Sequence, residues 1–227
     1  MFVIDPPAVP SVAIAYDSRR FPVHRIYCVG RNYADHAREM GAEASGEQPT
    51  FFLKPADAVV DSGAVVPYPP GTNELHHEVE LVVALGSGAR DLDLGAALEH
   101  VYGYAVGLDL TRRDLQAVAK QKGLPWDTAK SFDHSAPVSA ITPATEVGHP
   151  RAGSLWLNVN GEPRQRGDIG SMVFDVPTIL CELSKLFELR AGDLIFTGTP
   201  AGVGPLARGD HFQAGCDRLS ILEGSIG

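Results

Sequence analysis

Three carboxylates set within apolar stretches are the residues of this sequence best suited to bind a metal ion. Glu78 and Glu80 open the run E-V-E-L-V-V-A-L, whose β-branched residues predict a buried strand over 78–85. Side chains two apart on a strand project to the same face, so the two carboxylates can approach within about 7 Å. Asp109 lies near the end of a second apolar run, 101–110, which predicts another strand and a third carboxylate at its end.

Two ionised carboxylates in an apolar strand need a proton, a basic partner or a cation. The alternative is that Glu78 and Glu80 lie on a solvent-exposed sheet face, where alternating glutamates are common. If these two bind a metal together with Asp109, an all-carboxylate set selects Mg²⁺ or Mn²⁺ over zinc and leaves positions open for substrate and water. The adjacent His76 and His77 point to opposite faces, so we interpret them as packing groups or as support for the ligands.

A histidine and a glutamate form a candidate acid–base pair. His36 and Glu39 are three apart after Gly30, in a segment that Asn32 can cap as a short helix and that Gly41 can end. On one helix face the carboxylate can orient the imidazole and raise its basicity, which is the arrangement of a general base. An exposed polar pair with no chemical role is the alternative.

Basic and amide side chains near these acids could bind a substrate carboxylate. Lys130 lies in A-K-S-F-D, close to Trp126, and its ammonium could enter an aromatic-lined cleft. Arg113 and Gln116 are three apart on a helix expected just after Asp109, where they could form a fork for a carboxylate. A surface lysine and an ordinary exposed helix face are the alternatives.

A glycine-rich turn, 198–204, reads G-T-P-A-G-V-G and follows a predicted strand over 194–197. It lacks the spacing and the lysine of a nucleotide-binding loop, so we do not expect a nucleotide there. Its backbone N–H groups and the Thr199 hydroxyl can still bind an anion.

Two further patterns predict elements close to these residues. Asn160 and Gly161 suit the two positive-φ positions of a type I′ turn, so a β-hairpin should follow the strand expected over 155–159. Thr111 is expected to cap a helix that runs to Gly123.

The remaining patterns decide the expected fold class. Asp175 and Pro177 predict the start of an amphipathic helix that closes near Gly192. Residues 1–22 contain four prolines and predict an extended arm or an edge strand. Strands outnumber helices and do not alternate with them one for one, so the sequence predicts a β-rich α+β fold with peripheral helices.

The bulk composition narrows the partners and the compartment. A chain of 227 residues fits one domain. Its 28 acidic and 19 basic residues give a formal charge of −9, which argues against a nucleic-acid partner. Cys28, Cys181 and Cys216 form no disulfide or zinc pattern, so we expect a reducing cytoplasm. No apolar run is long enough to predict a membrane span.

These pieces together resemble the fumarylacetoacetate hydrolase family. Six motifs in family order, spanning about residues 24 to 215, carry the resemblance: G-R-N-Y-A-D-H-A-R-E at 30–39, F-L-K-P at 52–55, H-H-E-V-E-L at 76–81, G-L-D-L-T-R-R-D at 107–114, A-K-S-F-D at 129–133 and T-G-T-P-A-G-V-G at 197–204. The resemblance implies a mixed β-roll with peripheral helices, an N-terminal arm at 1–22, one catalytic domain at 23–227, and a homodimer.

The resemblance also implies a role for each matching residue. It implies that Mg²⁺ or Mn²⁺ is held by Glu78, Glu80 and Asp109. It implies a base at His36 with Glu39, charge stabilisation by Lys130, and substrate contacts from Lys54, Arg113, Gln116 and Thr199, with Arg31 as a further candidate.

The activity that the resemblance implies is hydrolysis of a carbon–carbon bond in a 2,4-diketo acid. Fumarylpyruvate, cleaved to fumarate and pyruvate in gentisate-type aromatic catabolism, is the substrate we expect. An acylpyruvate hydrolase, an oxaloacetate decarboxylase, and an inactive member with a structural or binding role are the alternatives. The polar segment 41–49 is our candidate lid, with an ordinary loop as its alternative.

Overall fold

The structure is a computed structural model that describes residues 1–39 and 48–227. The expected lid at 41–49 lies almost wholly outside the described residues. A central sheet is the largest sheet that the described residues form. Its strands follow the order β4 (Thr50–Lys54), β3 (Ile26–Gly30), β15 (Leu194–Phe196), β8 (Val79–Leu85), β9 (Val101–Leu108), β11 (Ala136–Val138) and β5 (Val59–Asp61), with β12 (Thr142–Pro143) paired to β9.

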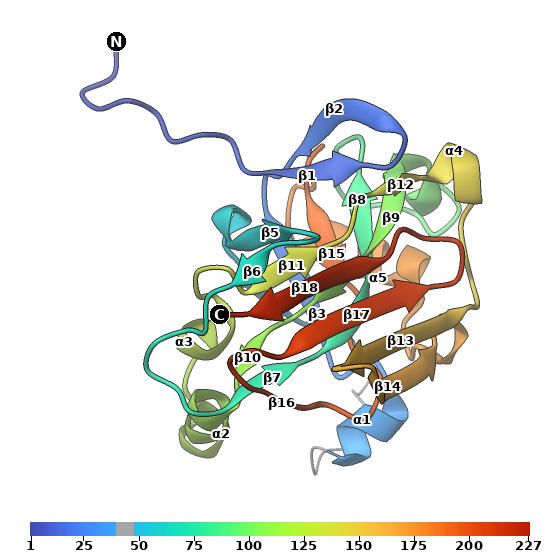
Figure 1. Cartoon of the computed structure of the whole chain (residues 1–227). Helices are drawn as coiled ribbons and strands as arrows, with labels where there is room; N and C mark the ends of the chain where they lie inside the picture. Colours follow the sequence, from blue (N-terminus) through green and yellow to red (C-terminus); the bar gives the residue numbers. More distant parts are fainter. Residues whose placement is uncertain (40–47) are drawn as a thin grey trace.

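A second sheet lies across the central one (Figure 1). Its strands follow the order β14 (Glu162–Asp168), β13 (Ser154–Val159), β17 (His211–Cys216), β18 (Leu222–Ile226) and β6 (Val65–Val66). The main apolar core lies between the two sheets and contains Leu81, Val83 and Leu85 from β8 together with Leu155, Leu157 and Phe212 from the second sheet. Val82 and Ala84 alternate to the other face, where they pack with Ile26 and Phe196. The strand β8 is therefore buried on both faces.

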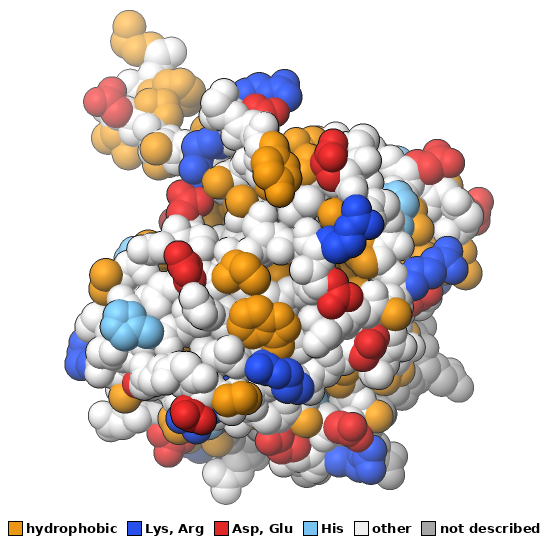
Figure 2. All heavy atoms as spheres, turned by 45° about the vertical axis from the view of Figure 1, so that its right-hand side comes forward, with side chains coloured by type: hydrophobic (Ala, Val, Ile, Leu, Met, Phe, Trp, Pro, Cys, Tyr) orange, Lys and Arg blue, Asp and Glu red, His pale blue; other side chains and the backbone are white. Residues whose placement is uncertain are grey.

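Two smaller sheets complete the strands of the described chain. One has the order β10 (Thr111–Arg112), β7 (Leu75–His77) and β16 (Gly204–Leu206), and the other is the hairpin of β1 (Ser11–Ile14) and β2 (Asp17–Pro22). The residues before β1 extend away from the body of the molecule (Figure 1), and Figure 2 shows their apolar side chains standing clear of it. The arm expected at 1–22 is thus an extended leader followed by a hairpin.

The helices lie around the sheets (Figure 1). They are α1 (Ala34–Glu39), α2 (Arg113–Lys122), α3 (Asp127–Lys130), α4 (Ala144–Val147) and α5 (Val176–Leu186), with single 3₁₀ turns at Ala56–Ala58, Ala97–His100 and Ile169–Ser171. This strand-rich α+β architecture with peripheral helices confirms the predicted fold class. Among the described residues, no helix has both the length and the apolar character needed to cross a membrane.

Several local predictions are confirmed. Asn160 and Gly161 have φ of 53° and 81° and join β13 to β14 as a hairpin. Asp175 caps α5, because its side chain accepts hydrogen bonds from the backbone N–H and the hydroxyl of Thr178. Gly123 ends α2 in the left-handed conformation, with φ of 63°.

Two helix boundaries differ from the prediction. Thr111 does not cap α2: it belongs to β10, and its hydroxyl donates to the Asp109 carbonyl oxygen instead. Pairing of β10 with β7 holds Thr111 extended, so its hydroxyl is not available to the helix. The helix α5 ends at Leu186 rather than near Gly192.

Candidate functional site

Three carboxylates are buried side by side where β8 and β9 meet. Glu78 precedes β8, Glu80 is its second residue, and Asp109 follows β9. Antiparallel pairing of the two strands brings them together, and the Asp109 N–H donates to the Glu78 carbonyl oxygen at 2.8 Å. One oxygen from each carboxylate lies within 4.8 Å of the others, and the three residues are 1% to 5% exposed. The exposed sheet face is therefore the wrong interpretation.

Cations from separate elements surround the carboxylates, and two of them contact Glu78. The ammonium of Lys130, at the end of α3, lies 2.8 Å from Glu78 Oε2 and 2.6 Å from Asp109 Oδ2. Arg113 Nη2, at the start of α2, lies 2.5 Å from Glu78 Oε1. Burial raises the pKa of Glu78, but the charges of Lys130 and Arg113 outweigh burial and hold the pKa below its ordinary value. Glu78 is therefore ionised at neutral pH.

Glu80 has a different environment from Glu78. Its Oε2 accepts a hydrogen bond of 2.7 Å from the Gly198 N–H, and no lysine, arginine or histidine of the described chain forms an ion pair with it. Burial, followed by the negative charges of Asp109 and Glu78, raises the pKa of Glu80 well above its ordinary value. Without a cation, Glu80 therefore keeps its proton to a higher pH than an ordinary glutamate does.

The oxygens of this cluster fit a hard divalent cation. Glu80 lacks a cationic partner in the described part of the chain. Asp109 Oδ1 is buried without a hydrogen bond there, although the Lys54 ammonium lies 2.9 Å away. Mg²⁺ and Mn²⁺ prefer oxygen donors, and a set made only of carboxylates meets this preference. The three residues could therefore hold such an ion, and binding it would compensate the charge of Glu80.

His36 borders the same cavity as the carboxylates. Its ring is buried, and its Nδ1 lies 3.5 Å from Glu39 Oε2, too far for a short hydrogen bond. Glu39 is more exposed and its Oε2 also accepts the Gly202 N–H at 3.1 Å. Burial lowers the pKa of His36 despite the neighbouring Glu78 and Glu39. The imidazole is therefore neutral at neutral pH and able to accept a proton.

Most of the site residues expected from the sequence line one cavity. Its walls contain Arg31, His36, Glu78, Glu80, Asp109, Arg113, Gln116, Lys130 and Thr199. Gln116 Oε1 accepts from Arg113 Nη1 at 2.5 Å, so the two side chains lie together on one face of α2, and their contact with a substrate carboxylate stays a prediction. Lys54 does not line the cavity: its ammonium lies behind Asp109, where it donates to the backbone oxygens of Leu110 and Lys130.

The sequence did not reveal Gln165, a buried residue of β14. Its Oε1 is 2.8 Å from His77 Nδ1 and accepts from the Val79 N–H at 3.1 Å. Its Nε2 donates to Thr199 Oγ1 at 2.8 Å and to the Pro200 carbonyl oxygen at 2.9 Å. This amide ties the start of β8 to the Thr199 turn. No signal could have found it, because E-P-R-Q-R-G-D has no apolar alternation.

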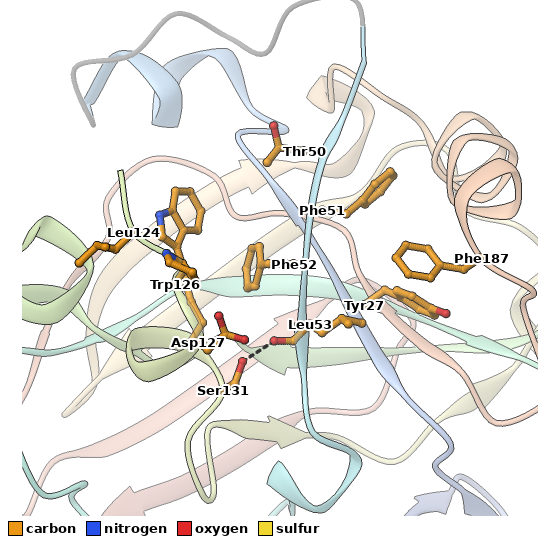
Figure 3. A pocket seen from close by; sticks show the side chains of 12 residues that line it. Tyr27, Thr50, Phe51, Phe52, Leu53, Leu124, Trp126, Asp127, Ser131 and Phe187 are labelled. Atoms are coloured by element: carbon orange, nitrogen blue, oxygen red, sulfur yellow. Dashed lines mark hydrogen bonds between the residues drawn. The ribbon is translucent and has the colours of Figure 1, made fainter. Parts of the chain in front are cut away.

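An aromatic pocket of about 410 Å³ lies next to the site cavity (Figure 3). Phe51 and Phe52 project to opposite sides of β4, and the Phe52 ring faces Trp126 with 5.8 Å between ring centroids. Phe52, Trp126 and Lys130 line both cavities. The ring pair therefore lies where the metal-side cavity and the aromatic pocket adjoin.

Comparison with known proteins agrees with this arrangement. Residues 25–226 match the family model described as fumarylacetoacetate (FAA) hydrolase C-terminal. A mitochondrial oxaloacetate tautomerase of Bos taurus is 50% identical over 190 residues, covering 84% of this chain and 86% of that protein. An oxaloacetate tautomerase of Escherichia coli is 43% identical over 202 residues, covering 88% and 92%.

A solved structure resembles the whole chain. It is a fumarylpyruvate hydrolase of Pseudomonas aeruginosa in complex with Mn²⁺ and pyruvate, and it has 48% sequence identity and a TM-score of 0.97 over 100% of this chain and 99% of that one. The match extends over both sheets and the cavity between the strand ends.

Binding of Mn²⁺ should be accompanied by proton release, because the raised pKa of Glu80 makes a proton compete with the cation for this carboxylate. Calorimetric titration in buffers of different ionisation enthalpy measures this release, and the affinity should fall as the pH is lowered. Glu80→Gln should abolish the release and weaken binding at least about tenfold, whereas Glu99→Gln at an exposed site should change neither. An affinity independent of pH between about pH 6 and pH 8 would contradict this assignment.

Gln165→Leu should lower the free energy of unfolding by about 1–3 kcal/mol, because it leaves buried donors and acceptors of β8 and the Thr199 turn without partners. Urea titration followed by circular dichroism measures this change. The matched Gln213→Leu, at an exposed position of β17, should stay within about 0.5 kcal/mol of the unaltered chain. Equal effects of the two substitutions would show that the buried amide network contributes nothing.

Proposed function

Because the chain belongs to the fumarylacetoacetate hydrolase family, we propose that it hydrolyses a carbon–carbon bond of a 2,4-diketo acid, with fumarylpyruvate as the best candidate substrate. The observation that carries the proposal is a neutral, buried His36 in one cavity with three metal-binding carboxylates. The solved hydrolase with Mn²⁺ and pyruvate, at 48% identity, supports this choice of substrate.

The reaction consumes one water and yields two acids. Water adds to the carbonyl carbon distal to the pyruvate portion, and the bond from that carbon to the pyruvate methylene breaks. The bonding electrons leave with the pyruvate fragment as an enolate, which takes up a proton to give pyruvate, while the other fragment leaves as fumarate. Glu78, Glu80 and Asp109 would hold Mg²⁺ or Mn²⁺, whose charge stabilises such an enolate.

His36 is the proposed general base. With Nδ1 turned towards Glu39, Nε2 is the nitrogen left to take a proton from water. A lowered pKa keeps the imidazole in the unprotonated form that this step requires. The 3.5 Å gap to Glu39 could shorten when the site is filled, as catalytic hydrogen bonds commonly do.

Lys130 is the proposed stabiliser of negative charge. Burial lowers its pKa, but the carboxylates of Asp109 and Glu78 outweigh burial and hold the pKa above its ordinary value. Lys130 is therefore a positively charged ammonium at neutral pH, and it can offset charge that develops on the leaving enolate. Arg113 with Gln116, Thr199 and Arg31 would orient the substrate from the walls of the same cavity.

A second candidate function is the interconversion or decarboxylation of oxaloacetate. Relatives at 43–50% identity are named oxaloacetate tautomerases, and one of Dictyostelium discoideum at 42% is named an oxaloacetate decarboxylase. These reactions also pass through an enol or enolate, so the carboxylates and Lys130 would serve them equally. Neither needs water to attack a carbonyl carbon.

We further propose that residues 23–227 form the catalytic unit and that the arm at 1–22 is accessory. A homodimer in the cytoplasm is the proposed state, and the three buried, unpaired cysteines fit a reducing compartment.

His36→Ala should reduce kcat for fumarylpyruvate hydrolysis at least about 100-fold, since the attacking water loses its base. Loss of the enol absorbance of the diketo acid with Mn²⁺ present measures the rate, with acetylpyruvate and oxaloacetate assayed in parallel. His211→Ala, at an exposed position of β17, is the matched control. Full hydrolysis by His36→Ala removes the base from this scheme. Turnover of oxaloacetate alone by the unaltered chain supports the second candidate instead.

A further inference from the structure

One cation of the cavity wall belongs to no ion pair in the described part of the chain. Lys120 lies on α2 with Arg113 and Gln116, at spacings of three and four that place all three on one helix face. At 1.5 Å per residue, its Cα lies about 10 Å along the axis from Arg113, the residue bonded to Glu78. Lys120 therefore joins the cavity wall from a point on α2 about two helical turns beyond Arg113.

Two other cations of the cavity wall are already engaged by the carboxylates. Arg113 pairs with Glu78, and Lys130 with Glu78 and Asp109. Lys120 is an exposed residue, and its ammonium lies 5.5 Å from the centroid of the Trp126 ring. Burial, followed by the positive charge of Arg113, lowers the pKa of Lys120 to about 8. The ammonium is thus partly removed from water, and a bound anion would compensate its positive charge.

The surroundings of Lys120 favour a ligand whose distal end is an anion over a ligand whose distal end is neutral. Arg113, Lys130 and Arg31 act on Lys120 as neighbouring positive charges, and the carboxylate of Glu78 offsets them in part. A neutral acyl end here would displace water from the Lys120 ammonium and provide no compensating charge. The neighbouring aromatic pocket shares Phe52, Trp126 and Lys130 with this cavity, and Lys120 does not line that pocket.

We propose that Lys120 binds the second carboxylate of a dicarboxylic 2-keto acid and so makes the chain selective for diacids over neutral acylpyruvates. The inference rests on the proposed function for the metal end and deepens it by naming the substrate class. Lys120 is a specificity residue in this scheme and takes no part in bond cleavage.

Binding of unreactive keto acids tests the proposal without turnover. We would compare 2-oxoheptanedioate, with seven carbons like fumarylpyruvate, and 2-oxoheptanoate, its monocarboxylate counterpart, by calorimetry on the Mn²⁺-loaded protein. The unaltered chain should bind the diacid at least about tenfold more tightly, as one charge-assisted contact would give. Lys120→Met should reduce this preference to about twofold or less, and Lys120→Arg should retain most of it.

Lys122→Met is the matched control, because Lys122 lies on the same helix but does not line the cavity. It should keep the preference of the unaltered chain. The absence of any diacid preference in the unaltered chain, or a full preference in Lys120→Met, overturns the proposal.

Turnover separates this inference from the proposed function. In a hydrolase, Lys120→Met should raise KM for fumarylpyruvate at least about tenfold, with little change in KM for acetylpyruvate. If neither diketo acid is hydrolysed but the diacid preference still depends on Lys120, the proposed reaction fails while the proposed binding site stands. Equal changes in KM for both substrates would show that Lys120 only supports the structure of α2. That result would overturn the proposed contact with the second carboxylate.

Discussion

The site depends on burying three carboxylates within a few ångströms of one another. Like charges at this separation repel strongly in a poorly polarisable interior, so the chain has to bring compensating groups to the same place. It does so from separate elements: Lys54 ends β4, Arg113 begins α2 and Lys130 ends α3. The packing of these elements around the ends of β8 and β9 follows from this constraint, because removing one partner would leave a charge buried alone.

The compensation is uneven, and the unevenness gives the cluster its chemistry. Glu78 contacts two cations, whereas Glu80 receives only a backbone N–H. A cluster in which all charges were matched would be a static structural network. Here one carboxylate is left for a proton or a metal ion, and the Gly198 turn that bonds it also carries Thr199 into the cavity. One short turn therefore contacts the metal-site residue Glu80 and also places Thr199, the proposed substrate contact, in the cavity wall.

The sequence predicts features that local chemistry decides and fails where distant contacts decide. The turn at Asn160 and Gly161 and the cap at Asp175 depend on neighbouring residues alone, and both are present. Spacing alone could not decide whether Glu78 and Glu80 form a metal site or lie on an exposed face. The burial of β8 decides it, and that burial depends on strands that are distant in the sequence. Thr111 and Gln165 eluded prediction for the same reason: their partners lie on other strands.

In the proposed scheme, helix α2 divides recognition of the keto-acid end of the substrate from recognition of its distal end. Arg113 is bonded to Glu78 and Gln116, so its position is coupled to the carboxylates. Lys120, two turns further along, has neither of these contacts, and its side chain can change without breaking an ion pair of the described chain. Since the helical repeat keeps both on one face, substrate choice at the distal end can vary while the charge balance of the metal end stays intact.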